Sequence, residues 1–188
     1  MSQPSPFIPS LSVEDYLTLE ETSGIRHELI GGYLYAMAGG TLIHNLIVQG
    51  LRDVLVRQLR PRGCRVFTEN VKLHLADDFF YPDVMVSCNR NAETRLYATE
   101  PVLLAEVLLE GNIAHDRVIK FNVYRRIPSL QAYLILSQED FRIEVWGADN
   151  NWERSHVYNA GEVIRLTGLS LDIPVDEVYD EVRADLGR

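Results

Sequence analysis

The sequence predicts an α/β (α+β) fold with a mixed central β-sheet flanked by helices. Two observations indicate this class: helical and strand-like hydrophobic periods alternate along the chain, and residues 101–109 and 130–137 form nearly continuous apolar runs. Such runs are typical of interior strands that are covered on both faces. The chain has 188 residues, of which 46% are hydrophobic, and this is enough for one sizeable core. We therefore expect a single domain over residues 1–188.

The N-terminal elements are predicted to be a helix, a hairpin and a second helix. Ser12 begins a loose capping box, which predicts a short helix over residues 12–22. Gly31 and Gly32 separate two strand-like runs and can adopt the positive φ values of a tight hairpin turn. Apolar side chains then recur at helical spacing over residues 41–59, which predicts a long amphipathic helix.

The middle of the chain is predicted to form strands. Residues 71–75 alternate apolar and polar side chains, the period of a half-exposed strand, and an acidic pair after them supplies a turn. A second strand, with the sequence FYPDVMVSC, follows that turn and carries Asp83 near its start. The apolar run 101–109 is expected to lie inside the sheet, although Glu106 interrupts it.

The C-terminal part is predicted to alternate helices and strands. Residues 115–126 favour a helix, and residues 130–137 favour another buried strand. Residues 141–158 are typical of a hairpin with its tip at 149–151. Residues 173–182 predict a short closing helix.

The charge of the chain limits its partners. A formal net charge of −9 argues against strong non-specific affinity for nucleic acid, because that affinity comes from basic residues that neutralise phosphates. Residues 52–65 nevertheless contain five arginines, and we single out Arg57 and Arg60 as candidate nucleic-acid contacts. A solvated helix face explains these arginines about as well.

The cysteines and the apolar segments indicate the compartment. No run of about 18 apolar residues is present, and the first residues lack a basic segment followed by an apolar one, so we expect a cytoplasmic protein without a membrane span. Cys64 and Cys88 suit neither a disulfide framework nor a zinc site, and we expect reduced thiols.

Asp83 and Glu106 are the candidate catalytic and metal-ligating residues. Each lies in an apolar strand, where a lone buried charge costs several kcal/mol. If the two strands are neighbours, a divalent cation between the carboxylates would satisfy both, and Mg²⁺ prefers such oxygen ligands. The alternative is structural: Asp83 could belong to a turn, and Glu106 could pair with an arginine.

Further polar residues could support such a site. Asp116, Lys120 and Tyr124 follow at i, i+4 and i+8 and so share one helix face, where Lys120 could hold an attacking water or offset charge in a transition state. A surface ion pair between Asp116 and Lys120 is the simpler alternative. Glu28 and His44 could form an outer ring, or could be ordinary strand surface and helix cap respectively.

Several segments together resemble a known family. "RHELIGGYLYAMAGG", the histidine of "TLIHN", "YPDVMV", "LLAEVL" and "DRVIKFNVYRRIPSLQAYLILS" resemble the Uma-two family of restriction-endonuclease-like proteins, also called domain of unknown function 820. The resemblance covers a core of about residues 14–178. It implies a branch of the PD-(D/E)XK nucleases, with a restriction-endonuclease-like core, an N-terminal hairpin and a C-terminal hairpin. It also implies an endonuclease that uses Mg²⁺ (or Mn²⁺) and no organic cofactor to hydrolyse phosphodiester bonds in DNA.

The resemblance assigns roles to individual residues. Asp83 matches the aspartate of the PD motif, and Glu106 matches the acidic residue of the second motif. Leu108 stands where the superfamily often has its lysine, so the family resemblance implies that Lys120 on the following helix takes that role. By the same resemblance, Glu28, His44, Asp116 and Tyr124 are the supporting residues of the site.

The chain also departs from the family pattern. Residues 109–112 lack the hydroxyl side chains that family members usually have after the second acidic motif, and the turn at Gly31 and Gly32 lacks two carboxylates. These departures leave a second hypothesis open: a catalytically inactive nuclease-like module that binds a nucleic acid or protein partner. If the enzyme cuts both strands of a duplex, symmetry favours a homodimer as the active form.

Overall fold

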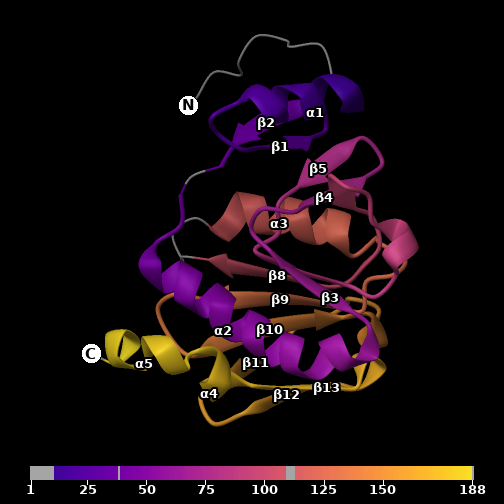
Figure 1. The fold of residues 1–188 in the computed structure, drawn as a ribbon. Helices are drawn as coiled ribbons and strands as arrows, with labels where there is room; N and C mark the ends of the chain where they lie inside the picture. Colours follow the sequence, from indigo (N-terminus) through magenta and orange to yellow (C-terminus); the bar gives the residue numbers. More distant parts are fainter. Residues whose placement is uncertain (1–10, 38, 109–112, 188) are drawn as a thin grey trace.

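The largest sheet of the molecule is mixed and has six strands. The computed structural model describes residues 11–37, 39–108 and 113–187, except the side chains of 113–117. Within these ranges the order of the large sheet is β11-β10-β9-β8-β6-β3 (Figure 1). The strands are, in that order, His156–Asn159, Arg142–Gly147, Ala132–Ser137, Pro101–Leu108, Val84–Ser87 and Arg65–Thr68. β8 and β9 are parallel and the other neighbours antiparallel, which confirms the predicted mixed sheet.

Two smaller sheets complete the β-structure of the described residues. Figure 1 shows one of them above the large sheet, with strand order β2-β1-β5-β4-β7. Its strands are Tyr33–Ala36, His27–Ile30, Asp78–Phe80, Lys72–Leu75 and Tyr97–Ala98. The other is a hairpin of β12 (Val163–Leu166) and β13 (Leu171–Pro174), which the sequence analysis did not predict.

The helices of the described residues agree with most predicted positions. The α-helices are α1 (Val13–Thr22), α2 (Leu42–Leu59), α3 (Ile113–Tyr124), α4 (Val175–Val178) and α5 (Arg183–Leu186). The short 3-10 helices are η1 (Arg60–Arg62), η2 (Arg90–Ala92), η4 (Ala148–Asn150), η5 (Thr167–Leu169) and η6 (Asp180–Val182). Ser12 caps α1 and Thr41 caps α2, each through a side-chain oxygen that accepts a backbone N–H two or three residues into the helix. The predicted closing helix is shorter than expected, because residues 171–174 belong to β13.

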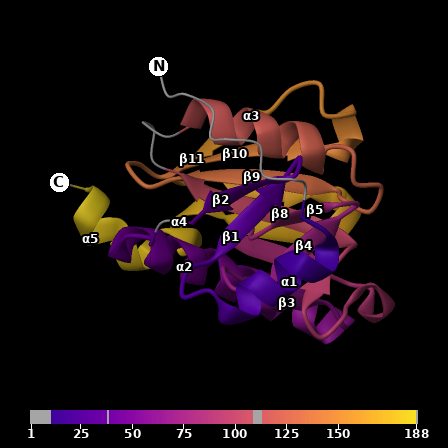
Figure 2. The ribbon, with the colours of Figure 1, turned by 90° about the horizontal axis from the view of Figure 1, so that it is seen from above.

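Helices and strands of the smaller sheets cover both faces of the large sheet. α2, α4 and the β12–β13 hairpin pack on one face around a core that includes Leu51, Val86 and Leu134. α3 and the β4–β5 strands pack on the other face, where Met85 and Leu104 contact them. Figure 2 shows α2 and α3 on opposite sides of the strands. The apolar runs are therefore covered on both faces, as predicted.

One glycine allows the close approach of α2 to α4. A Cβ at Gly50 would lie 2.1 Å from the carbonyl oxygen of Val178, so no larger residue fits without moving backbone. The adjacent Tyr179 hydroxyl donates to the carbonyl oxygens of Ser137 and Arg142, at 3.0 and 2.8 Å. These contacts fix the C-terminal helices on the middle of α2 and on the C-terminal end of β9.

The segment between residues 64 and 88 differs from the prediction. The predicted single strand FYPDVMVSC is split into the end of β5 and the whole of β6, which lie in different sheets. Pro82 lies between them and has no N–H to donate to a ladder, which explains the break. The predicted turn before Asp78 is confirmed, because β4 and β5 pair as a hairpin there.

The prediction of reduced thiols is wrong. Cys64 and Cys88 form a disulfide with an S–S distance of 2.05 Å. The pairing of β3 with β6 explains it, because the register places Arg65 opposite Ser87 and so brings the two flanking cysteines together. This relationship between strands distant in sequence was not visible from cysteine spacing. Separately, none of the helices in the described residues could span a membrane.

Candidate active site

The structure brings Asp83 and Glu106 together at one end of the large sheet. β6 and β8 are antiparallel, and their register pairs Val84 with Ala105, so Asp83 lies opposite Glu106. The Val107 backbone N–H donates to Asp83 Oδ2 at 2.7 Å, which holds the aspartate against the neighbouring strand. The side chain of Asp83 is 14% exposed and that of Glu106 is 5% exposed. One carboxylate is thus almost fully buried, and the other is reachable from outside.

Lys120 supplies the positive charge next to Glu106. Its Nζ lies 3.0 Å from Glu28 Oε1 and 3.3 Å from Glu106 Oε1, and the side chain is 7% exposed. The three groups come from β1, β8 and α3, so the network joins two sheets and a helix. Breaking a buried ion pair by removing one partner leaves an uncompensated charge, which is strongly destabilising. Removing any one of the three side chains should therefore lower the stability of the fold.

Neutral hydrogen-bond donors complete the surroundings of the two glutamates. The Tyr124 hydroxyl donates to Glu106 Oε1 at 3.2 Å, and the Tyr81 backbone N–H donates to Glu28 Oε1 at 3.0 Å. Burial and the negative charges of Glu106 and Glu28 raise the pKa of Tyr124 well above its ordinary value. Tyr124 therefore remains a neutral donor at any physiological pH.

His44 lies in the first turn of α2 and contacts Asp83 from there. Its Nε2 is 3.1 Å from Asp83 Oδ2, and its Nδ1 is buried and has no hydrogen-bond partner among the described residues. Burial lowers the pKa of His44, but the hydrogen bond to Asp83 and the charges of Asp83 and Glu69 outweigh it, so the pKa is raised. The Nε2–H therefore donates to the aspartate and orients it.

Glu69 is a site residue that the sequence analysis missed. It follows β3 directly, and the β3–β6 register that pairs Thr68 with Val84 brings it beside Asp83. Its Oε1 lies 3.6 Å from His44 Nδ1. Its φ of 45° is unusual for a residue other than glycine. Nothing in its local sequence distinguishes it from a polar loop residue, and only the strand pairing reveals it.

The structure thus gathers most of the predicted site residues. Asp83, Glu106 and Lys120 lie together with Glu28, His44 and Tyr124, through the contacts given above. Asp116 belongs to α3, but its side chain falls outside the described residues, as do residues 109–112. Arg57 and Arg60 lie at the far end of α2, where Arg57 pairs with Glu177.

The donors at this site fit a hard divalent cation. Mg²⁺ is often held by one or two protein carboxylates and completes its shell with water and substrate oxygens. Asp83 and Glu106 are such a pair, and the contacts of Asp83 with protein groups in the described residues fall on Oδ2. No cluster of three or more His, Cys, Asp or Glu side chains with metal-site geometry occurs in that part of the chain.

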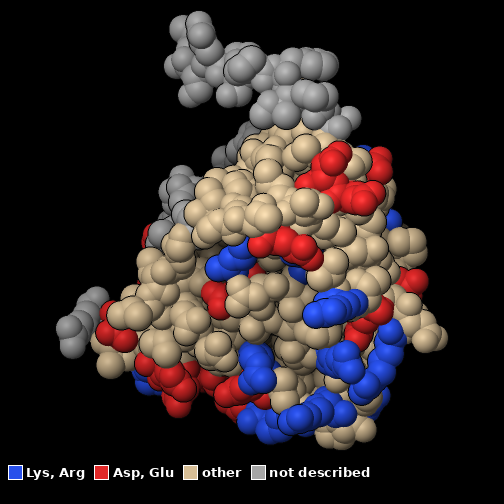
Figure 3. Space-filling view, turned by 45° about the horizontal axis from the view of Figure 1, so that its top comes forward, with Lys and Arg blue, Asp and Glu red and all other residues tan. Residues whose placement is uncertain are grey.

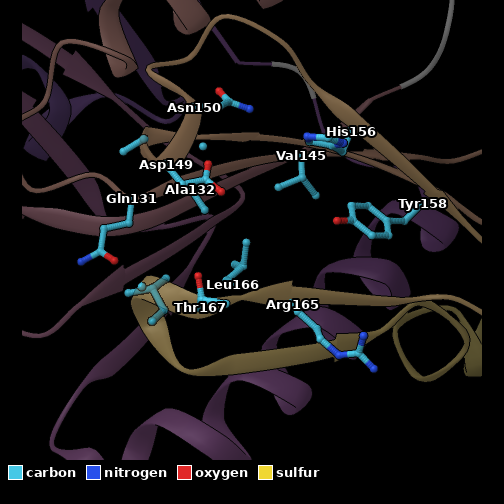
Figure 4. Close-up of a pocket in the computed structure, with 14 residues that line it drawn as sticks. Gln131, Ala132, Val145, Asp149, Asn150, His156, Tyr158, Arg165, Leu166 and Thr167 are labelled. Carbon is cyan, nitrogen blue, oxygen red and sulfur yellow. The ribbon is translucent and has the colours of Figure 1, made fainter.

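A separate cavity of about 380 Å³ lies at the other end of β9. Figure 4 shows Gln131, Asp149 and Thr167 around it, between the large sheet and the β12–β13 hairpin. Glu106 pairs with Ile135, three residues further along β9 than the Ala132 of the cavity wall. The cavity is therefore distinct from the carboxylate site.

The mixed sheet with helices on both faces is the arrangement expected of a restriction-endonuclease-like core (Figure 2). The chain belongs to the Uma2 family, described as putative restriction endonuclease, which matches residues 13–176. An uncharacterized protein of Synechocystis sp. is 33% identical over 181 residues, covering 94% of this chain and 95% of that protein. A second uncharacterized Synechocystis protein is 33% identical over 149 residues, covering 76% and 84%.

A solved structure has the same fold. It is a crystal structure described as a putative nuclease of the DUF820 family from Anabaena variabilis, and it superposes with a TM-score of 0.72. The match covers 90% of this chain and 98% of that one, at 15% identity. The expectation of a restriction-endonuclease-like core is thereby confirmed.

Proposed function

We propose that this chain is a metal-dependent endonuclease of the PD-(D/E)XK type that hydrolyses phosphodiester bonds in DNA. The observation that carries the proposal is the pairing of Asp83 and Glu106 on adjacent strands, with Lys120 Nζ 3.3 Å from Glu106. Hydrolysis of a phosphodiester needs groups that offset negative charge at the phosphate and orient a water. Two carboxylates and one ammonium at a single strand end can meet both needs.

In this proposal Asp83 and Glu106 would hold Mg²⁺ (or Mn²⁺). When bound, such an ion lowers the pKa of a water and neutralises charge on the scissile phosphate. Lys120 would hold the attacking water or offset the charge that develops on the phosphate oxygens. Its short contacts to Glu28 and Glu106 fix the position of its ammonium before substrate arrives.

The supporting residues would act through the catalytic ones. Glu28 holds Lys120 in place, and Tyr124 donates to Glu106 and fixes the rotamer of that carboxylate. His44 does the same for Asp83, whose second contact is the Val107 N–H. Supporting hydrogen bonds of this kind commonly change activity or metal affinity by about 10–100-fold when they are removed.

Plasmid cleavage tests the proposal. Supercoiled DNA is incubated with chelator-stripped protein to which Mg²⁺ or Mn²⁺ has been added, and the products are resolved by electrophoresis. We expect the wild type to nick or linearise the plasmid, and Asp83→Asn and Glu106→Gln to lose at least two orders of magnitude in rate. Glu181→Gln, the same change at an exposed carboxylate, should leave the rate unchanged. Equal rates for all four proteins would mean that another nuclease in the preparation cuts the DNA.

A homodimer is the active form that we propose, since cutting both strands of a duplex requires two sites. Closed twofold symmetry is the commonest way for identical chains to provide them. Linear product without accumulation of nicked plasmid, together with twice the chain mass in light scattering, would support the dimer. A monomer that produces only nicked plasmid would contradict it.

A partner-binding module without catalysis is the second candidate function. One observation favours it: Lys120 lies against Glu106 and partly neutralises that carboxylate in the absence of an ion. Such a module would bind DNA or a protein while its carboxylates remained structural. DNA binding by the wild type without any cleavage in Mg²⁺ or Mn²⁺ would select this candidate over the first.

A further inference from the structure

One face of the molecule carries a cluster of basic side chains (Figure 3). Figure 3 shows lysine and arginine side chains gathered towards the lower right of the view, the side on which β3 and the C-terminal end of α2 lie in Figure 1. A surface hollow with a volume of about 410 Å³ lies there and is lined by η1, β3 and neighbouring residues. Four arginines line it: Arg52, Arg60, Arg65 and Arg90. We call this surface the arginine concavity.

The arginine concavity carries a net positive charge in an acidic protein. Arg52 pairs with Asp53 at 3.0 Å and Arg65 pairs with Glu93 at 2.7 Å, so the charges of these two are locally offset. Arg60 and Arg90 have no ion-pair partner among the described residues, and both are exposed. These two residues therefore supply the unbalanced charge.

Two other arginines of the same segment are directed elsewhere. Arg57 pairs with Glu177 on α4, and Arg62 Nη1 donates to the carbonyl oxygens of Leu169 in η5 and of the adjacent Ser170. Only the structure separates these from Arg60, since all lie within a few residues in sequence. Arg90 joins the concavity from η2, which follows β6.

The arginine concavity and the candidate active site lie at opposite ends of the same strand. Arg65 begins β3, and Glu69 follows its last residue and approaches His44 beside Asp83. Four residues of extended chain span about 13 Å, which corresponds to roughly four phosphates along one strand of B-form DNA. A duplex that ran parallel to β3 would therefore pass from the Asp83 end of the strand to the Arg65 end within about four phosphates.

We infer that the arginine concavity binds the phosphodiester backbone of duplex DNA about four nucleotides from the scissile phosphate. The inference rests on the proposed function only for the choice of partner. The net charge of −9 does not prevent it, because charges more than about 8–10 Å away are largely screened at physiological salt. The guanidinium groups of Arg60 and Arg90 suit phosphate oxygens, which they can contact with paired N–H groups.

Salt-dependent binding tests this inference separately from cleavage. Fluorescence anisotropy with a labelled duplex is measured in EDTA at several KCl concentrations, for the wild type, the Arg60→Ala/Arg90→Ala double variant and Arg154→Ala. Each lost phosphate contact should reduce the slope of log affinity against log salt by about 1, so the double variant should lose about 2. Arg154→Ala removes an exposed arginine just before β11, at the opposite edge of the large sheet from β3, and should bind within twofold of the wild type.

The outcomes distinguish this inference from the proposed function. A double variant with the affinity and salt slope of the wild type would overturn the inference, as would a wild type that does not bind duplex even at low salt. Wild-type cleavage combined with an unaffected double variant would reject the arginine concavity but leave the nuclease intact. Salt-dependent binding that requires Arg60 and Arg90, without cleavage in Mg²⁺, would support the concavity and reject catalysis.

Discussion

The two ends of strands β3, β6 and β8 carry different chemical groups. At one end Asp83 and Glu106 meet Lys120 and His44 in a buried network of charges and hydrogen bonds. At the other end the Cys64–Cys88 disulfide joins the strands, and the charges are exposed arginines. The middle of the strands is apolar on both faces, which fixes their register. Packing in the middle thus sets the geometry, and the two ends are left to carry different chemistry.

Removing Lys120 from the charged end of the strands should cause the largest loss of stability. Lys120→Met leaves Glu28 and Glu106 close together without the cation between them, and we expect a loss of about 3–5 kcal/mol in the free energy of unfolding. Urea denaturation followed by circular dichroism measures this. The Glu28→Gln/Lys120→Met double variant should recover part of the loss, because one carboxylate becomes neutral. Equal stability of Lys120→Met and wild type would mean that the network is not buried in solution.

Opening the disulfide should weaken the other end without changing the site. The Cys64–Cys88 bond has a sequence separation of 24 residues, and closing a loop of that size is worth about 3 kcal/mol in the chain-entropy account. We expect dithiothreitol to lower the free energy of unfolding by that amount and to leave plasmid cleavage unchanged at 25 °C. The Cys64→Ala/Cys88→Ala variant should be insensitive to dithiothreitol and serves as the control. A cleavage rate that falls on reduction would show that the two ends are coupled.

A single hydrogen bond at the charged end should have a smaller effect. Tyr124→Phe removes the donor to Glu106 Oε1, and a hydrogen bond to a charged group is worth about 1.5–3 kcal/mol. The matched control is Tyr158→Phe, since the Tyr158 hydroxyl makes no hydrogen bond within the described residues. Urea denaturation of the two variants compares the effects directly. A loss for Tyr158→Phe as large as that for Tyr124→Phe would refute the role of this bond.

A substitution at Asp176, on the exposed surface of α4, should have the smallest effect on stability. That effect should depend on pH. The Gly161 N–H and Arg183 lower the pKa of Asp176 below its ordinary value. A lowered folded-state pKa contributes stability above the unfolded-state pKa, and this contribution is lost as the pH falls through the folded-state value. Asp176→Asn should therefore cost some stability at pH 6, and the cost should shrink as the pH is lowered towards 2. A cost that is the same at both pH values would exclude titration of Asp176 as its cause.

Much of the fold could be predicted because its signals are local. The spacing of apolar residues in α2, the Gly31-Gly32 turn and the continuous apolar run of β8 each depend on neighbours in sequence. The division of the middle segment between two sheets could not be predicted in this way. It depends on the position of Pro82 and on pairings between strands that lie far apart in the chain.

The same distinction applies to the candidate site. Asp83 and Glu106 could be singled out because charges in apolar strands are costly and therefore need a reason. Glu69 and Arg90 could not, because each lies in a polar loop and acquires its position only through the pairing of β3 with β6 or the turn after β6. The disulfide was mispredicted for the same reason, since cysteine spacing alone does not show which strands are neighbours.

Calorimetric titration with Mn²⁺ tests the central claim, that Asp83 and Glu106 together hold a catalytic ion, most directly. Chelator-stripped wild type, Asp83→Asn and Glu106→Gln are titrated with and without a duplex oligonucleotide, and each variant is first shown to unfold cooperatively. We predict binding by the wild type and its loss in both variants. Absence of binding by the wild type in the presence of DNA, or unchanged binding by both variants, would contradict the account.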